Sequence, residues 1–155
     1  MPIDIKTNAI VAYVAKNHGT ATITSLIKLA YLIDYVSVKK TGCQISSFSY
    51  YRWHFGPFDQ SIYEVRDALL AANQLESKVE YNTFAEYQVY SCNTDVDMSI
   101  FSAEEMSIID GLLLQTQGYG PKMLTDVAYT TPPMVKIGAK IDNKEGIGTT
   151  LDLTI

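Results

Sequence analysis

Apolar residues recur every three or four positions over much of the chain, and this spacing predicts amphipathic helices. The predicted helices cover residues 4–17, 24–40, 58–73, 102–117 and 121–129. Helix 24–40 has the densest apolar pattern, with Leu26, Leu29 and Ile33 on one stripe and further apolar residues on both flanks. A helix that is apolar nearly all round packs on several sides, so we expect this one at the centre of the fold.

Capping residues mark the ends of the later helices. Ser102 and Glu105 fit a capping box, in which each side chain accepts a hydrogen bond from the main-chain N–H of the other residue. Pro121 suits the first turn of helix 121–129. The two prolines at 132–133 are expected to end that helix.

Over residues 75–91 the apolar residues recur about every second position, and this spacing predicts a β-hairpin. Val79 and Tyr81 precede the turn residues at 82–83, and Tyr87 and Val89 follow them. Asparagine is a frequent turn residue, so Asn82-Thr83 fits the tip of this hairpin.

Residues 46–55 fit two different structures. In a strand, Tyr51, Trp53 and Phe55 would share one face. In a short helix, capped by a serine at 46 or 47, Phe48, Tyr51 and Phe55 would share a face instead. We prefer the helix, and we expect Gly56-Pro57 to break it and to start the next one.

These elements predict an α+β fold that is mainly α-helical. A chain of 155 residues and 17.2 kDa has the size of one compact domain. We expect a helical domain over residues 1–137, with a winged-helix-like order of helices and one small hairpin at about 75–91. Residues 138–155, rich in glycine and threonine, are expected to be a flexible segment that closes with an edge strand.

The order helix, helix, short helix, helix and hairpin raises the alternative of a winged-helix DNA-binding regulator. The distribution of charge opposes this alternative. The chain has a net charge of −5, and residues 1–54 carry six basic and two acidic side chains, whereas residues 58–91 carry two basic and six acidic ones. The recognition helix and the wing would therefore repel phosphate, and we expect no DNA partner.

Composition gives no sign of a catalytic or metal centre. Two cysteines are too few for a disulfide scaffold or a cysteine-rich zinc site. His54 is the one candidate acid–base group, and no carboxylate, cysteine or second histidine lies beside it at motif spacing. We therefore expect a protein that is not an enzyme and has no cofactor. The absence of a signal-peptide pattern and of a long apolar run leads us to expect a cytoplasmic protein with no membrane partner.

The most unusual stretch is Tyr50–Phe58, in which six of nine residues are aromatic or histidine and one is Arg52. Tryptophan, tyrosine and arginine are the side chains most enriched at interface hot spots. A core corner shaped by Gly56-Pro57 explains the same residues, so core and interface both remain open for this stretch. Lys28, on an apolar helix, either extends to the surface or lies at the rim of a partner-binding cleft.

These segments together resemble the Panacea domain of SocA-like antitoxins. The matching features are Leu26-Ile27-Lys28-Leu29-Ala30-Tyr31-Leu32, Gly42, Arg52-Trp53, Gly56-Pro57-Phe58, Ile62-Tyr63, Leu69 and the hairpin. The resemblance covers roughly residues 5–130. It implies a non-enzymatic antitoxin from a bacterial, archaeal or phage toxin–antitoxin pair, which neutralises its cognate toxin by direct binding. Some members of the family look like proteolytic adaptors, which implies a cellular protease as a further partner.

With this resemblance, the aromatic stretch becomes the expected partner-binding surface. The expected anchors are Arg52, Trp53, Phe58 and Tyr63, with Lys28 and Tyr31 behind them and Gly56-Pro57 as the structural turn. Tyrosine supplies contact area at a low cost in side-chain entropy, and the chain has 11 tyrosines. We expect residues 138–155 to become ordered when the partner binds.

Overall fold

The computed structural model describes residues 4–19 and 21–155. Its helices are α1 (Ile5–His18), α2 (Ile23–Thr41), α3 (Ile62–Ala71), α4 (Ala103–Gln115), α5 (Pro121–Tyr129) and α6 (Pro132–Lys136). Its strands form two antiparallel hairpins, β1 (Tyr51–Trp53) with β2 (Gly56–Phe58), and β3 (Glu76–Tyr81) with β4 (Glu86–Ser91). The prediction of a mainly helical α+β fold is confirmed.

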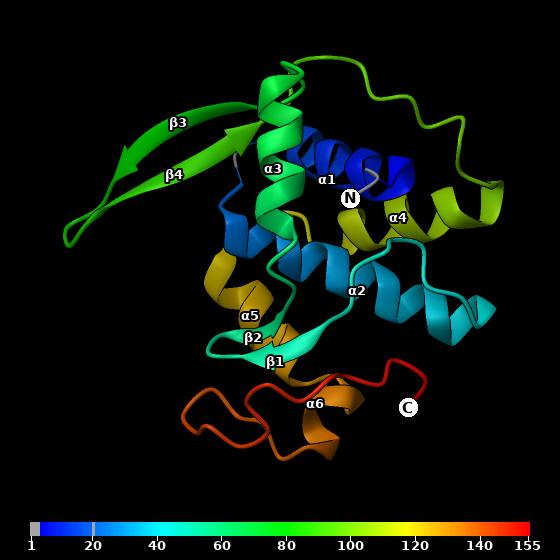
Figure 1. Ribbon diagram of the computed structural model, residues 1–155, viewed down its shortest axis with the longest axis vertical. Coiled ribbons are helices and arrows are strands. Elements are labelled where there is room, and N and C mark those ends of the chain that lie inside the picture. Colours follow the sequence, from blue (N-terminus) through cyan, green and yellow to red (C-terminus); the bar gives the residue numbers. More distant parts are fainter. Residues whose placement is uncertain (1–3, 20) are drawn as a thin grey trace.

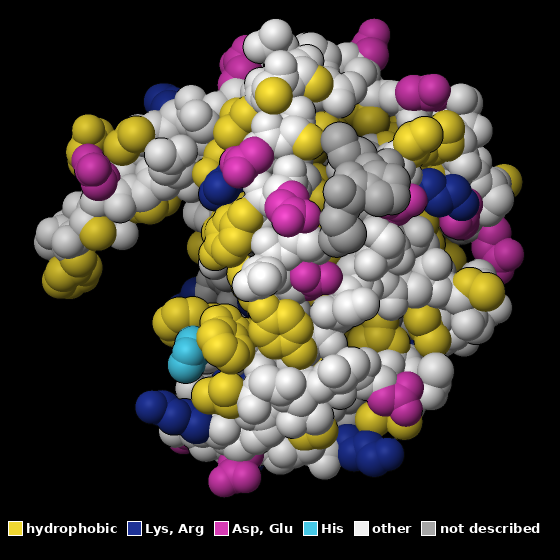
Figure 2. Space-filling view, in the orientation of Figure 1, with side chains coloured by type: hydrophobic (Ala, Val, Ile, Leu, Met, Phe, Trp, Pro, Cys, Tyr) yellow, Lys and Arg dark blue, Asp and Glu magenta, His cyan; other side chains and the backbone are white. Residues whose placement is uncertain are grey.

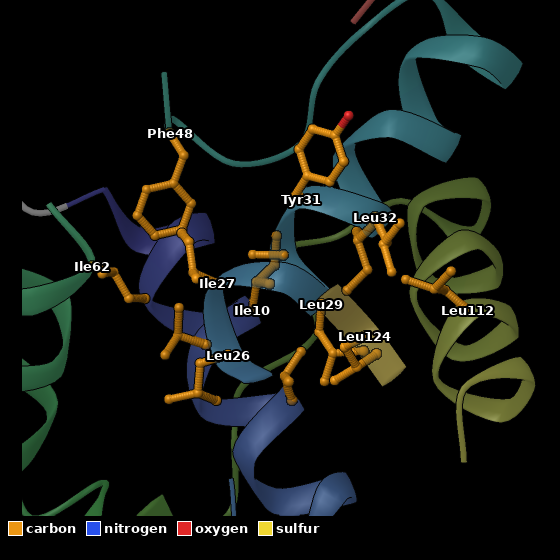
Figure 3. Packing of buried hydrophobic residues seen from close by; sticks show 14 of the residues in the cluster. Ile10, Leu26, Ile27, Leu29, Tyr31, Leu32, Phe48, Ile62, Leu112 and Leu124 are labelled. Carbon is orange, nitrogen blue, oxygen red and sulfur yellow. The ribbon is translucent and has the colours of Figure 1, made fainter. Parts of the chain in front are cut away.

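Helix α2 lies at the centre of the fold, as its apolar pattern predicts (Figure 1). It contacts α1, α4, α5, β2 and β4, and eleven of its residues are buried. Figure 3 shows Ile10 of α1, Ile62 of α3, Leu112 of α4 and Leu124 of α5 around its apolar side chains. None of the helices in the described part of the chain has the length and apolar character required to cross a membrane.

The predicted helix over 46–55 is wrong, because Tyr51–Trp53 forms a strand. Its register pairs Tyr51 with Phe58 and Trp53 with Gly56. The alternation of the strand places Tyr51 and Trp53 on one face, while Arg52 points inward and is fully buried. A two-residue period in a stretch of three residues is too short to be distinguished from helical spacing in the sequence.

Two further boundaries follow from this hairpin. Because Phe58 pairs with Tyr51, the helix predicted over 58–73 begins only at Ile62. The described residues thus contain two hairpins instead of one, and the short helix of the winged-helix order is replaced by β1 and β2.

The prolines at 132–133 follow the end of α5, as predicted, and they also form the first turn of a further short helix, α6.

The second hairpin and the capping box are confirmed. Strands β3 and β4 pair over six residues each, and the Asn82 side chain accepts hydrogen bonds from the main-chain N–H of Phe84 and Ala85 at the tip. This hairpin extends from the body of the molecule as an arm (Figure 1). At α4, Ser102 and Glu105 form both hydrogen bonds of the predicted box.

Residues 138–155 contain no helix or strand, yet they lie against the outer edge of β1. Arg52 N–H donates to Thr149 O at 2.9 Å, and Leu151 N–H donates to Tyr50 O at 2.9 Å. Thr150 forms a single antiparallel bridge with Tyr51, and Leu151 is buried. The flexibility expected of this segment stays a prediction, and these hydrogen bonds argue against it in the partner-free protein.

The packing of α4 on α2 gives a stability prediction with an internal control. Leu112 is 8% exposed, whereas Leu114 on the same helix is 73% exposed. We expect Leu112→Ala to lower the free energy of unfolding by about 2–4 kcal/mol, because it leaves a cavity in the core. Leu114→Ala should cost less than about 1 kcal/mol. Urea denaturation of both variants checks this, and equal losses would contradict the placement of α4.

Candidate functional site

Four aromatic side chains form a continuous outer surface on the β1–β2 hairpin and the start of α3. We call Tyr51, Trp53, Phe58 and Tyr63 the aromatic platform. Ring centroids lie 5.7 Å apart for Tyr51 and Trp53, 6.1 Å for Tyr51 and Phe58, and 5.8 Å for Phe58 and Tyr63. These are the distances of edge-to-face and tilted aromatic contacts, so the rings hold one another in place.

The platform is accessible from solvent. Trp53 is 42% exposed and Tyr63 is 41% exposed, while Phe55 in the β1–β2 turn is 75% exposed. Figure 2 shows hydrophobic side chains gathered over this hairpin, on the same side of the molecule as the β3–β4 arm and below it. An exposed group of large apolar rings is a common mark of a protein-binding surface.

The segment that leads into the platform is fixed by Asp34, a buried carboxylate on α2. It accepts hydrogen bonds from the main-chain N–H groups of Ile45 and Ser46, both at 3.0 Å. It also accepts bonds from the Ser46 hydroxyl at 2.5 Å and the Tyr50 hydroxyl at 2.6 Å. Burial raises the pKa of Asp34, and these four donors oppose that shift. The burial of the Tyr50 hydroxyl and the nearby Asp34 carboxylate raise the pKa of Tyr50 well above its usual value.

Lys28 supports the platform from below. Its side chain is buried, and its Nζ donates to Pro57 O in β2 at 3.0 Å. Gly56 makes this approach possible: it has a φ of +107°, and a Cβ there would lie 3.3 Å from Tyr129 Cε2 and 3.4 Å from Lys28 Cε. Burial lowers the pKa of Lys28 from 10.5 to about 7. The lysine thus neither extends to the surface nor lines the rim of a cleft.

Arg52 joins the underside of the hairpin to residues 138–155. Its guanidinium donates to Trp53 O at 2.6 Å, to Lys140 O at 2.9 Å and to Asn143 O at 2.8 Å. The guanidinium carbon lies 5.5 Å from the centre of the Tyr129 ring, a cation–π distance. Its Nε has no hydrogen-bond partner among the described residues. Arg52 is thus bound to main-chain oxygens inside the protein.

The structure divides the expected anchors into two groups. Trp53 and Tyr63 are exposed, and Phe58 is half-buried with its ring against that of Tyr63. Arg52, Lys28 and Tyr31 are 0%, 2% and 0% exposed, so they support the platform and offer no surface to a partner in this conformation. The Tyr31 hydroxyl lies 2.7 Å from the Thr131 hydroxyl and the Tyr31 ring 5.2 Å from that of Tyr50.

The predicted anchors omitted the half-buried Tyr51 of the platform, the exposed Phe55 beside it, and Asp34 as the main internal support. Strand alternation would have found Tyr51, since it lies two residues from Trp53. Asp34, like Lys28, is a lone charged residue in an apolar helix, and this pattern in the sequence would have found it.

The other chemistry that the sequence raised finds no further support. His54 lies in the β1–β2 turn, with its ring 4.7 Å from that of Trp53. Within the described part of the chain, no three or more His, Cys, Asp or Glu side chains are placed to hold a metal ion. On α3 and the arm, Glu64, Asp67, Glu76, Glu80 and Glu86 outnumber the basic residues, which disfavours a phosphate backbone as partner.

The family model for the SocA-like antitoxin, Panacea domain, matches residues 26–133. This range contains all but the first three residues of α2, both hairpins, α3, α4 and α5, and therefore the whole aromatic platform with its supports Asp34 and Lys28. The chain belongs to the SocA-like antitoxin family. Helix α1 and residues 138–155 lie outside the matched range. Comparison with curated proteins and with solved structures found no match.

The buried Lys28 gives a prediction for the pH dependence of stability. Below about pH 7 both the folded and the unfolded chain hold the lysine proton. Between that pH and the ordinary lysine pKa only the unfolded chain holds it, so unfolding takes up a proton. The Lys28 contribution to the free energy of unfolding should therefore rise with pH, by up to about 1.4 kcal/mol per pH unit.

Lys28→Met removes this charge and keeps an unbranched side chain. We expect the variant to gain stability relative to the wild type at pH 6–7, with a gain that shrinks towards pH 9.5. Lys40→Met, in the exposed last turn of the same helix, is the matched control and should show no such trend. Denaturation curves at several pH values measure the difference, and a gain independent of pH would contradict a buried titrating amine.

Arg52 gives a prediction for residues 138–155. Arg52→Met removes the hydrogen bonds to Lys140 and Asn143, so the open population of this segment should rise roughly tenfold or more. Trypsin should then cleave faster after Lys140 and Lys144, while cleavage after Lys16 in α1 measures global unfolding and should not change. Equal cleavage of the wild type and the variant at Lys140 would contradict the role of the guanidinium.

Proposed function

We propose that this protein neutralises a cognate protein toxin by binding it directly through the aromatic platform. Membership of the SocA-like antitoxin family supports the general role. The observation that carries the proposal is the exposure of Trp53 on β1 and of Tyr63 at the start of α3, next to a hairpin whose underside is fixed by buried polar groups. A surface that is rigid before binding loses little entropy on association, so its apolar contacts convert efficiently into affinity.

We further propose that binding masks the toxin. A complex in which the platform covers the active surface of the toxin needs no other protein. The alternative outcome of the same binding is delivery of the toxin to a protease. Measuring the amount of toxin in cells with and without this protein separates the two. A constant amount of an inactive toxin supports masking, and a falling amount means that this protein acts as an adaptor.

The test of the platform uses the small toxic product of a neighbouring reading frame as partner. Trp53→Ala should weaken binding by about 2 kcal/mol, or about 30-fold, since large central rings dominate such interfaces. The same variant should fail to rescue growth when toxin and antitoxin are expressed together. Titration calorimetry of the purified pair measures the affinity.

Leu114→Ala is the control for this test, because it removes an apolar side chain that is even more exposed than Trp53 from α4, away from the platform. It should leave affinity and rescue unchanged. Circular dichroism of both variants verifies that they fold. A folded Trp53→Ala protein that binds the toxin as tightly as the wild type would refute the platform as the binding surface.

A further inference from the structure

A groove runs between the β3–β4 arm and the body of the protein. It has a volume of about 1010 Å³. Tyr87 and Val89 of the arm line one wall, and Ile23, Leu70 and Pro121 line the other. Figure 2 shows a hollow on the corresponding side, between the arm and the hydrophobic side chains over the β1–β2 hairpin. The groove and the aromatic platform therefore open on one side of the molecule.

The groove lies along a strand edge that is only partly occupied. Tyr90 of β4 exchanges two main-chain hydrogen bonds with Ala21, at 2.9 and 2.8 Å, on the edge away from β3. Two residues further along, the chain enters α2 at Ile23 and leaves that edge. Among the described residues, no segment continues the pairing alongside Gln88 and Glu86.

The register of the hairpin shows which main-chain groups are free. Bonded and non-bonded residue pairs alternate along an antiparallel hairpin. Asn82 N–H donates to Ala85 O at 2.9 Å, which makes 82 and 85 a bonded pair. The pairs Val79–Gln88 and Tyr81–Glu86 are then non-bonded. Gln88 and Glu86 consequently direct their N–H and C=O groups away from β3, towards the groove.

The charge of the arm indicates the charge of the partner that would bind along it. The arm carries Glu76, Glu80 and Glu86 against Lys78 alone, and Glu86 lies on the free edge itself. The groove beneath the arm is lined by Arg66 and His18 beside Asp67, so the negative charge belongs to the strand edge and not to the groove. Two copies of this chain joined edge to edge would place these carboxylates close together, which charge repulsion opposes. A basic segment is attracted to the same edge.

We propose that β4 is a docking edge for an extended, basic segment of the toxin, which adds a strand beside Gln88 and Glu86 and places an apolar side chain in the groove. This inference rests on the proposed function and deepens it, since it names the element of the toxin that is recognised. Main-chain hydrogen bonds to the edge supply affinity, and the groove next to Tyr87 supplies selectivity for the inserted side chain.

The test removes one main-chain donor from each edge of the arm. Gln88→Pro eliminates an N–H that points towards the groove and leaves the bonded pairs of the hairpin intact. Val79→Pro does the same at its cross-strand partner, on the opposite edge of the arm. Gln88→Ala removes the side chain and keeps the N–H. All three variants are titrated with the purified toxin defined above.

We expect Gln88→Pro to weaken binding roughly tenfold or more, and Val79→Pro and Gln88→Ala to change it less than about threefold. Wild-type binding with no loss in Gln88→Pro would overturn the docking edge and leave the proposed function standing. A larger loss in Val79→Pro would place the partner on the other edge and also overturn it. If the wild type does not bind the toxin, the proposed function fails, and this inference with it.

Two further measurements test the chemistry of the occupant. Glu86→Lys should slow association with the toxin, because it removes attraction for a basic segment, and faster association would overturn the charge assignment. Sedimentation of the toxin-free protein tests the second-copy alternative. A dimer that Gln88→Pro converts to a monomer would show that the edge is occupied by another copy, and would overturn the proposal.

Discussion

The aromatic platform of this protein depends on two polar side chains that the central helix directs into the interior. Asp34 binds the chain at Ile45, Ser46 and Tyr50 before β1, and Lys28 binds Pro57 in β2. A buried polar group without partners is costly, so each of these bonds strongly favours one path of the chain. The hairpin and its outward rings are positioned by what lies beneath them.

The two buried basic side chains have an uncommon set of hydrogen-bond partners. Neither Lys28 nor Arg52 forms an ion pair among the described residues, and both donate mainly to main-chain oxygens. Tyr129 lies between them, next to Gly56 on one side and under the Arg52 guanidinium on the other. This arrangement joins the hairpin to α5 and to residues 138–155, so that segments outside the family match still contribute to the platform.

The platform and the arm lie on one side of the molecule, and in the proposed complex they offer two complementary kinds of contact. The platform offers preorganised apolar rings, which favour a complementary apolar patch on a partner. The arm offers main-chain donors and acceptors with negative charge around them. In the proposed complex, a partner held by both would have to match an apolar surface, a strand edge and a charge at once, and such a combination favours selectivity between related toxins.

Local patterns in the sequence were sufficient to predict α2, the β3–β4 hairpin and the capping box of α4, because each of these forms between residues close in the chain. The path of residues 46–58 was not predictable in this way. Its strands have three residues each, and they are fixed by Asp34, Lys28 and Thr149, which lie far from them in sequence. Composition together with the family resemblance predicted Trp53, Phe58 and Tyr63 as contact residues, but only the tertiary structure decided that Arg52 faces inward. The physical reason is that strand alternation and distant hydrogen-bond acceptors set the direction of a side chain, and neither is visible in the residue itself.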